Sequence, residues 1–120
     1  MGRVGKRVVV KLGNDDVIIL EPRMTGLVLV ADPPNVEHLR LRIDLEACPV
    51  KQLWFWDRRG LGLVYLLRPK EFALRLGLDR LGPDALQLNP ASLQERLGSS
   101  RREIKVALLD QRALAGVGNL

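Results

Sequence analysis

Arginines and glycine-flanked polar residues carry most of the chemistry that this sequence offers. Arginines outnumber lysines, and each planar guanidinium group can pair with a phosphate or a base through two hydrogen bonds. Arg58 and Arg59 are adjacent in a glycine-rich stretch, residues 57–62. Near the C-terminal end, Gly116 and Gly118 would let backbone N–H groups approach a phosphate closely, although the same pattern also fits an ordinary glycine cap after a helix.

Residues for acid–base or metal chemistry are scarce. Asp15 and Asp16 belong to a turn and Asp57 stands at the entrance of a loop, so the sequence offers no pair of catalytic carboxylates. Cys48 is the only cysteine and has no metal-ligand cluster beside it. It cannot form an internal disulfide, and a reducing cytoplasm is the expected compartment.

The charge of the chain favours a polyanionic partner. Its 120 residues include nineteen Lys and Arg against fourteen Asp and Glu, which gives a formal net charge of +5 and a pI near 10. Such an excess attracts nucleic acid or an acidic membrane surface, or it is simply a basic surface. The arginine content favours nucleic acid. No apolar run is long enough to span a bilayer, and the basic start is not followed by the long apolar core of a secretory signal.

The elements that would position these residues are strands up to residue 68. Runs of β-branched residues at 8–12 and 17–20 flank a turn and predict a hairpin. Further strands are expected at residues 27–31, 38–45, 52–56 and 63–67. The segment 38–45 alternates apolar and polar side chains, as a half-buried antiparallel strand does. Trp54 and Trp56 share one strand face and are expected to pack in the core or on the sheet rather than to stack on bases.

Helices are expected from residue 69 onward. Pro69 suits the first turn of a helix that ends at Leu76, and Asn89 suits the cap of a second helix that runs to Leu97. The segment 100–103 fits a capping box for a third helix, with three residues on its apolar face: Ile104, Ala107 and Leu108. The sequence therefore predicts the α+β class, with an antiparallel β half at residues 1–68 and a helical half at residues 69–120.

Several short segments follow one another in a specific order. They are Gly5-Lys6, Met24-Thr25-Gly26, the stretch 57–62, Leu81-Gly82-Pro83-Asp84, and the stretch 104–119 that ends in Gly-Val-Gly-Asn. In this order and spacing, the chain resembles the formamidopyrimidine-DNA glycosylase (Fpg/Nei) family, on the Fpg side because of Met-Thr-Gly. The resemblance covers nearly the whole chain, and the Leu-Gly-Pro-Asp and Gly-Val-Gly-Asn segments are its most specific parts.

The resemblance implies both a fold and an activity. Members have an N-terminal β-sandwich, a helix–two-turns–helix domain and a C-terminal zinc finger. They excise oxidised purines, notably 8-oxoguanine and formamidopyrimidines, and then cleave the strand at the abasic site. The target base is flipped out because its reactive carbon cannot be reached inside a duplex. Residues 1–68 would then be the C-terminal portion of the sandwich, and residues 69–120 a linker helix and the beginning of the helix–two-turns–helix domain.

The resemblance also implies phosphate contacts for three residues. Asn119 matches the family's phosphate-binding asparagine, and Lys6 matches the lysine that reaches the phosphate beside the lesion. Lys105 is a further basic candidate at the start of a helix. Each has a plainer alternative: a glycine cap for the turn at Asn119, and solvated lysines for Lys6 and Lys105. His38 matches a phosphate-contacting histidine only loosely, and an exposed strand histidine fits equally well.

Three other residues match family members that probe the base stack. Met24 matches the methionine that fills the space left by the flipped base, and Arg59 matches the arginine that contacts the orphaned partner base. Leu61 stands where the family has a phenylalanine wedge, and without aromatic stacking it should probe the helix more weakly or differently. The alternatives are a core methionine and a hairpin turn with one exposed cation.

The sequence departs from the family at the catalytic nucleophile. In the family, the amine of an N-terminal proline, followed by glutamate, attacks the sugar and forms an iminium. Here Gly2 is the second residue and no Pro-Glu pair opens the chain. The zinc finger would lie beyond Leu120, so no cofactor is expected in this segment. Glu21 also stands in a segment where the family has His-Leu-Gly, and its charge would repel phosphate.

Two functions follow, with a third and blander possibility. The first is a segment of a bifunctional glycosylase/AP lyase of base-excision repair, inactive alone. The second is a non-catalytic duplex-DNA-binding module derived from that family. The third is a basic fragment without a DNA function. The expected partner is double-stranded damaged DNA in the bacterial cytoplasm or nucleoid, with no membrane. Open sheet edges would favour self-association unless another segment completes the sheet.

Overall fold

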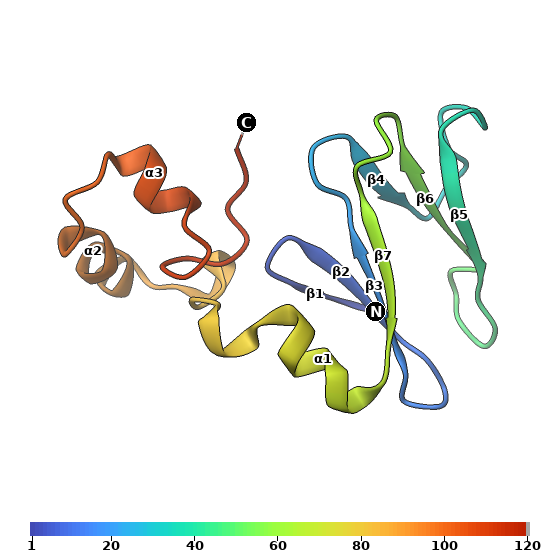
Figure 1. Cartoon of the computed structure of the whole chain (residues 1–120), viewed down its shortest axis with the longest axis horizontal. Coiled ribbons are helices and arrows are strands. Elements are labelled where there is room, and N and C mark those ends of the chain that lie inside the picture. The colour runs from blue at the N-terminus through green and yellow to red at the C-terminus, as the bar shows by residue number, and fades with distance from the viewer. Residues whose placement is uncertain (120) are drawn as a thin grey trace.

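The computed structural model describes residues 1–119, which form a β half and a helical half (Figure 1). Within these residues the β half consists of two antiparallel sheets. The helical half begins at α1 (Pro69–Leu76), which follows the last strand almost directly. The α+β arrangement predicted from the sequence is therefore confirmed.

The first sheet has four strands in the order β1-β2-β3-β7. These are β1 (Gly2–Val4), β2 (Arg7–Lys11), β3 (Val17–Glu21) and β7 (Leu63–Leu67). The predicted hairpin is confirmed as β2 and β3, and its turn is closed by the Asp16 backbone N–H, which donates to Asn14 Oδ1 at 3.1 Å. The sequence does not predict β1, because three residues with one apolar side chain carry no alternation.

The second sheet has three strands in the order β4-β6-β5. These are β4 (Gly26–Leu29), β5 (Leu39–Asp44) and β6 (Gln52–Asp57). The alternation expected in residues 38–45 is confirmed, because Leu39, Leu41 and Ile43 are half-buried while the residues between them are exposed. In Figure 1 this sheet lies on the side of the β half that is farther from α2 and α3.

The core of the β half lies between the two sheets. Val10 and Leu20 from the first sheet meet Leu53 and Phe55 from the second in one buried cluster. The other face of the first sheet carries a second cluster, in which Val9, Val17 and Ile19 pack against Leu76 of α1. Because the first sheet is covered on both faces, its central strands are apolar nearly throughout.

The helical half contains two further helices, α2 (Pro90–Gly98) and α3 (Ile104–Leu109), and two 3₁₀ turns, η1 (Leu78–Arg80) and η2 (Ala85–Gln87). The predicted cap of α2 is confirmed: Asn89 Oδ1 accepts a hydrogen bond from the Ser92 backbone N–H at 2.8 Å. None of the helices in residues 1–119 is long and apolar enough to cross a membrane.

The predicted capping box at residues 100–103 is wrong. Ser100 Oγ accepts from the Arg102 backbone N–H, two residues on, and the helix begins only at Ile104. The local turn competes with the helix for the serine hydroxyl, so the first helical turn forms later. The predicted apolar face is also incorrect at Ile104, whose side chain is exposed, whereas Ala107 is buried.

Candidate nucleic-acid interface

A cleft of about 740 Å³ lies where the β half meets the helical half. Its walls come from the β1–β2 turn, the β3–β4 loop, the end of α1 and the C-terminal turn. Five cationic side chains line it against one carboxylate, Glu21: Lys6, Arg7, Arg23, Arg80 and Arg112. Concave walls that carry one sign of charge focus the electrostatic potential, so this cleft suits an anionic ligand.

Lys6 reaches the cleft from the tip of the β1–β2 hairpin. Gly5 before it has a φ of 58°, and a Cβ atom at this position would lie 3.9 Å from Leu81 and Gln111 of the helical half. A larger residue in this left-handed conformation would be strained. The glycine therefore lets the turn approach the helical half and leaves the Lys6 side chain exposed at the cleft.

Met24 lies on the β3–β4 loop and is 78% exposed, so the structure excludes the alternative of a core methionine. The loop is closed by the Gly26 backbone N–H, which donates to the Pro22 carbonyl at 3.0 Å. Arg23 adopts a φ of 53°, which turns the chain tightly just before Met24. The loop thus holds an apolar side chain in solvent at the edge of a cationic cleft.

Arg59 comes from a different loop, between β6 and β7, and meets Met24 directly. Its Nη1 donates to Met24 Sδ at 3.7 Å. Leu61, two residues on in the same loop, is 43% exposed. The residues matched to the probing of the base stack, Met24, Arg59 and Leu61, therefore lie on two adjacent loops.

The buried carboxylate of Asp57 holds the β3–β4 and β6–β7 loops together through hydrogen bonds. Only 1% of it is exposed, and its carboxylate accepts from the Thr25 hydroxyl at 2.6 Å and from the backbone N–H groups of Arg59 at 3.2 Å and Gly62 at 2.7 Å. Burial acts to raise the pKa of Asp57, but these hydrogen bonds and a further one from Gly60 outweigh it and hold the pKa below its usual value.

Sequence reasoning places Asp57 only at a loop entrance and misses this role. A signal was present, however. Leu53 and Phe55 alternate on the inner face of β6, and Asp57 continues that register onto a core position. A carboxylate at a core position needs several hydrogen-bond donors, and the nearby threonine and glycine-rich loop supply them.

Glu21 does not act as the unpaired repulsive charge that its sequence position suggests. Its carboxylate pairs with Arg7 at 3.0 Å and with Arg23 at 3.5 Å. Both partners line the same cleft, so the local charge stays positive. The two arginines offset the charge of Glu21, and its effect on phosphate binding stays a prediction.

The C-terminal turn reaches the cleft through Gln111. Gln111 Nε2 donates to the carbonyls of Leu109 and Val117, each at 3.1 Å, and its Oε1 accepts from the Gly116 backbone N–H at 3.0 Å. One side chain thus spans the turn that precedes Asn119. Asn119 is exposed and lines the same cleft as Lys6 and Met24. Gly116 adopts a φ of 98°, as a left-handed glycine does.

An ion pair ties the two walls together. The Arg3 guanidinium donates to both carboxylate oxygens of Asp84 at 2.6 Å and to the Gly5 carbonyl at 2.7 Å. A hydrogen bond from the Leu86 backbone N–H, together with Arg3, holds the pKa of Asp84 below its usual value. Asp84 also pairs with Ala115 as a parallel bridge, which places the C-terminal turn beside the β1–β2 hairpin.

Four candidates are not among the residues that line the cleft. Arg59 and Leu61 lie on the β6–β7 loop, and Arg59 adjoins the cleft through its contact with Met24. Lys105 is exposed on α3 and is not among the residues that line the cleft, so its phosphate role stays a prediction. His38 packs edge-on against Trp56, with ring centroids 5.4 Å apart, on the outer face of the second sheet. Trp54 shares that face beneath Arg42, so the expected sheet-packing role of both tryptophans is confirmed. Within residues 1–119, no cluster of three or more metal-ligand side chains occurs.

The sequence and the fold are similar to those of known proteins. The family profile of the formamidopyrimidine-DNA glycosylase N-terminal domain matches residues 1–64. The formamidopyrimidine-DNA glycosylase of Chloroflexus aurantiacus is 33% identical over the whole chain, and that of Bacillus subtilis is 34% identical. The chain spans 43% and 44% of these two relatives, less than half of their length.

Solved structures agree with these relatives. The chain is similar to a Lactococcus lactis formamidopyrimidine-DNA glycosylase in complex with DNA that contains FAPY-dG, with a TM-score of 0.71, 27% identity and coverage of 98% of this chain and 45% of the other. MutM in complex with DNA containing carbocyclic 8-oxo-G is similar with a TM-score of 0.70, again at 27% identity and covering 98% of this chain and 45% of the other.

Proposed function

The chain belongs to the formamidopyrimidine-DNA glycosylase family, and from this membership we propose that it is the DNA-gripping segment of a bifunctional glycosylase and AP lyase that removes oxidised purines. The proposed partner is duplex DNA that contains 8-oxoguanine or a formamidopyrimidine. Relatives of similar fold bind such DNA, which supports this substrate class.

The contact between Met24 and Arg59 carries the proposal. An exposed methionine contacts an exposed arginine, and their two loops hydrogen-bond one buried carboxylate. A flexible apolar side chain and a cation able to read a base edge therefore lie together in solvent. Met24 would occupy the space left by an extruded base, Arg59 would hydrogen-bond the orphaned partner, and Leu61 would separate the adjacent base steps.

Lys6 and Asn119 would bind the phosphates on either side of this probe. They approach the same cleft from the two halves of the molecule, so a single bent strand could contact both. Phosphate contacts fix the register of a duplex and carry no sequence information, whereas base contacts discriminate. The two kinds of residue should therefore fail in different ways when they are substituted.

Binding to matched duplexes tests this division of roles. Asn119→Ala and Lys6→Gln should weaken binding to 8-oxoguanine and undamaged duplexes alike. Arg59→Gln should mainly reduce the ratio of the affinity for the 8-oxoguanine duplex to the affinity for the undamaged duplex. Lys51→Gln removes an exposed charge outside the cleft and is the control. Equal effects of Arg59→Gln on both duplexes would contradict the proposed reading of the partner base.

We further propose that the 120-residue chain binds DNA without base excision. The family's Pro-Glu pair does not occur within these 120 residues, and Gly2 pairs with Val9 at the far end of β1 from the hairpin tip. At about 3.3 Å per residue, this places Gly2 roughly 10 Å from Lys6. Borohydride reduction with 8-oxoguanine duplex should trap no covalent complex, and a trapped adduct would overturn the proposal.

A further inference from the structure

A second hollow, of about 550 Å³, lies on the helical half and is lined by the end of α2, the loop between α2 and α3, and the turn after α3. Four arginines line it against a single carboxylate, Asp110: Arg96, Arg101, Arg102 and Arg112. The hydroxyl-bearing residues Ser99 and Ser100 line it as well. None of the residues assigned to the base probe or to the first cleft's phosphates belongs to it.

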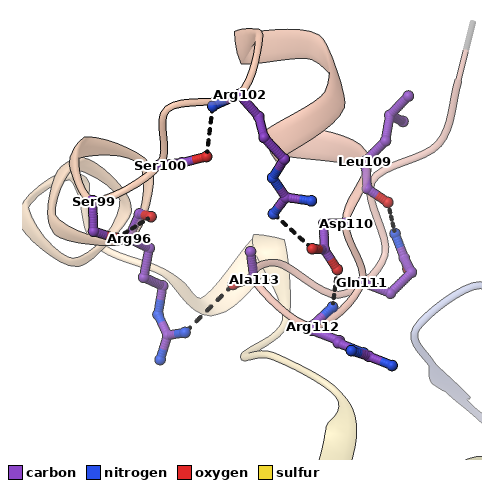
Figure 2. A network of polar contacts seen from close by, with 9 residues as sticks. All are labelled: Arg96, Ser99, Ser100, Arg102, Leu109, Asp110, Gln111, Arg112 and Ala113. Carbon is purple, nitrogen blue, oxygen red and sulfur yellow. Dashed lines mark hydrogen bonds and ion pairs between the residues drawn. The ribbon is translucent and has the colours of Figure 1, made fainter.

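Figure 2 shows how the single carboxylate is used. Asp110 Oδ2 accepts from Arg102 Nη2 at 2.8 Å, and its Oδ1 accepts from the Arg112 backbone N–H at 3.0 Å. Hydrogen bonds from Arg102, then from Arg112, hold the pKa of Asp110 below its usual value, so it stays ionised and occupied. It holds the loop in place, and the lining still carries four guanidinium groups against this one carboxylate.

The remaining arginines are left for a ligand. Within residues 1–119, no hydrogen bond or ion pair joins the guanidinium group of Arg101 or Arg112 to another group, and that of Arg96 makes only a 3.5 Å contact with the Ala113 carbonyl. Free carbonyl groups at the end of α2 would repel an anion. Two of them already accept hydrogen bonds, from Ser99 Oγ and from the Ser100 backbone N–H, which weakens this repulsion.

Arg112 connects this hollow to the first cleft, because it lines both. The two cationic hollows therefore adjoin at this arginine. We propose that this second hollow binds the phosphodiester backbone of the same duplex, beyond the region held by the cleft. Guanidinium groups pair with phosphate oxygens through two hydrogen bonds, which suits this chemistry. The proposal rests on the proposed DNA binding and extends its footprint.

Duplex length and salt test this second site. The Arg96→Gln/Arg101→Gln double variant of the full chain should bind a duplex of about 10 base pairs as the unsubstituted chain does. It should bind a duplex of about 25 base pairs more weakly, and the slope of log affinity against log salt should become shallower by roughly 0.9 for each phosphate that the variant no longer neutralises. Lys51→Gln/Lys70→Gln removes the same charge from exposed positions outside both hollows. It should leave the salt slope unchanged for both the shorter and the longer duplex.

The controls separate this inference from the proposed function. Arg96→Lys/Arg101→Lys keeps both positive charges and should show most of the salt slope of the unsubstituted chain. This result would show that the loss in the glutamine pair comes from the missing charge and not from misfolding. If the unsubstituted chain binds neither duplex, the proposed function itself fails. If it binds both, but the glutamine pair matches the lysine control pair, the second site is wrong. An effect of the glutamine pair on binding of inorganic phosphate alone, with none on the longer duplex, would also overturn it.

Discussion

Asp57 is the residue on which both probe-bearing loops depend. Its two oxygens accept hydrogen bonds from the Thr25 side of the β3–β4 loop and from Arg59 and Gly62 in the β6–β7 loop. Loops that carry binding residues need rigid support if the side chains are to arrive at fixed positions. One buried carboxylate can supply that support because both loops turn their donors toward it.

Replacement of Asp57 by Asn should loosen both loops. The amide keeps one acceptor but turns donors toward a backbone N–H, so we expect a loss of about 1–3 kcal/mol in the free energy of unfolding. The same variant should lose discrimination for damaged duplex, since Met24 and Arg59 would no longer be held together. Chemical denaturation and duplex binding measure the two effects, and Asp32→Asn at an exposed position is the control.

Acid should mimic this substitution. The pKa of Asp57 is lower in the folded chain than in the unfolded one, where it is near 3.9. Its contribution to stability is therefore fully present above about pH 4 and is lost as the pH falls through the lower folded value. Thermal melting from pH 7 to pH 3 should show a decline at the acid end that is smaller in Asp57→Asn. An identical acid decline in both proteins would exclude Asp57 as its source.

At the level of elements, the sequence predicts best where one local rule decides. The strand at 63–67 and the helix from Pro69 to Leu76 occur within the predicted bounds, because a short apolar run after a glycine-rich turn and an N-terminal proline are strong signals. The predicted start of α3 is wrong, because the Ser100 hydroxyl can accept a hydrogen bond from a backbone N–H in a turn as well as at the start of a helix. The meeting of Met24, Arg59 and the cleft depends on how two sheets and a helical half pack, which periodicity does not encode.

The segment at Gly82 is a joint between elements that tolerates little change. Its backbone N–H donates to the Gln111 carbonyl at 2.9 Å, and a Cβ atom there would lie 2.6 Å from the Arg112 carbonyl oxygen. Gly82→Ala should lower the free energy of unfolding by about 1–3 kcal/mol, as overpacking does. Gly98→Ala, at the end of α2 with open space around it, should be neutral or slightly stabilising in the same denaturation experiment.

At the scale of the whole molecule, the width of the cleft depends on contacts between its two halves. Arg3 and Asp84 form the ion pair across this joint, and their side chains are partly exposed. Exposed pairs contribute little to global stability. Arg3→Gln should therefore leave the melting temperature nearly unchanged, yet speed amide hydrogen exchange in the 115–119 turn and weaken duplex binding. Arg42→Gln, which breaks an exposed pair with Asp44, should do neither.

The edges of the first sheet bear on self-association. β7 is an edge strand of that sheet, and its Val64 and Leu66 side chains are 42% and 65% exposed. Exposed apolar edges favour pairing with another chain. Sedimentation at increasing concentration should show association that Leu66→Lys suppresses. A chain that stays monomeric at every concentration would refute this prediction.

The two tryptophans of the chain both sit on the outer face of the second sheet and line neither hollow. Their intrinsic fluorescence should thus follow the melting of the sandwich without direct quenching by a ligand in the cleft. An optical titration could then read, from the shift of that melting curve alone, how tightly the native form holds a duplex. The protein would need no attached dye to report its own affinity.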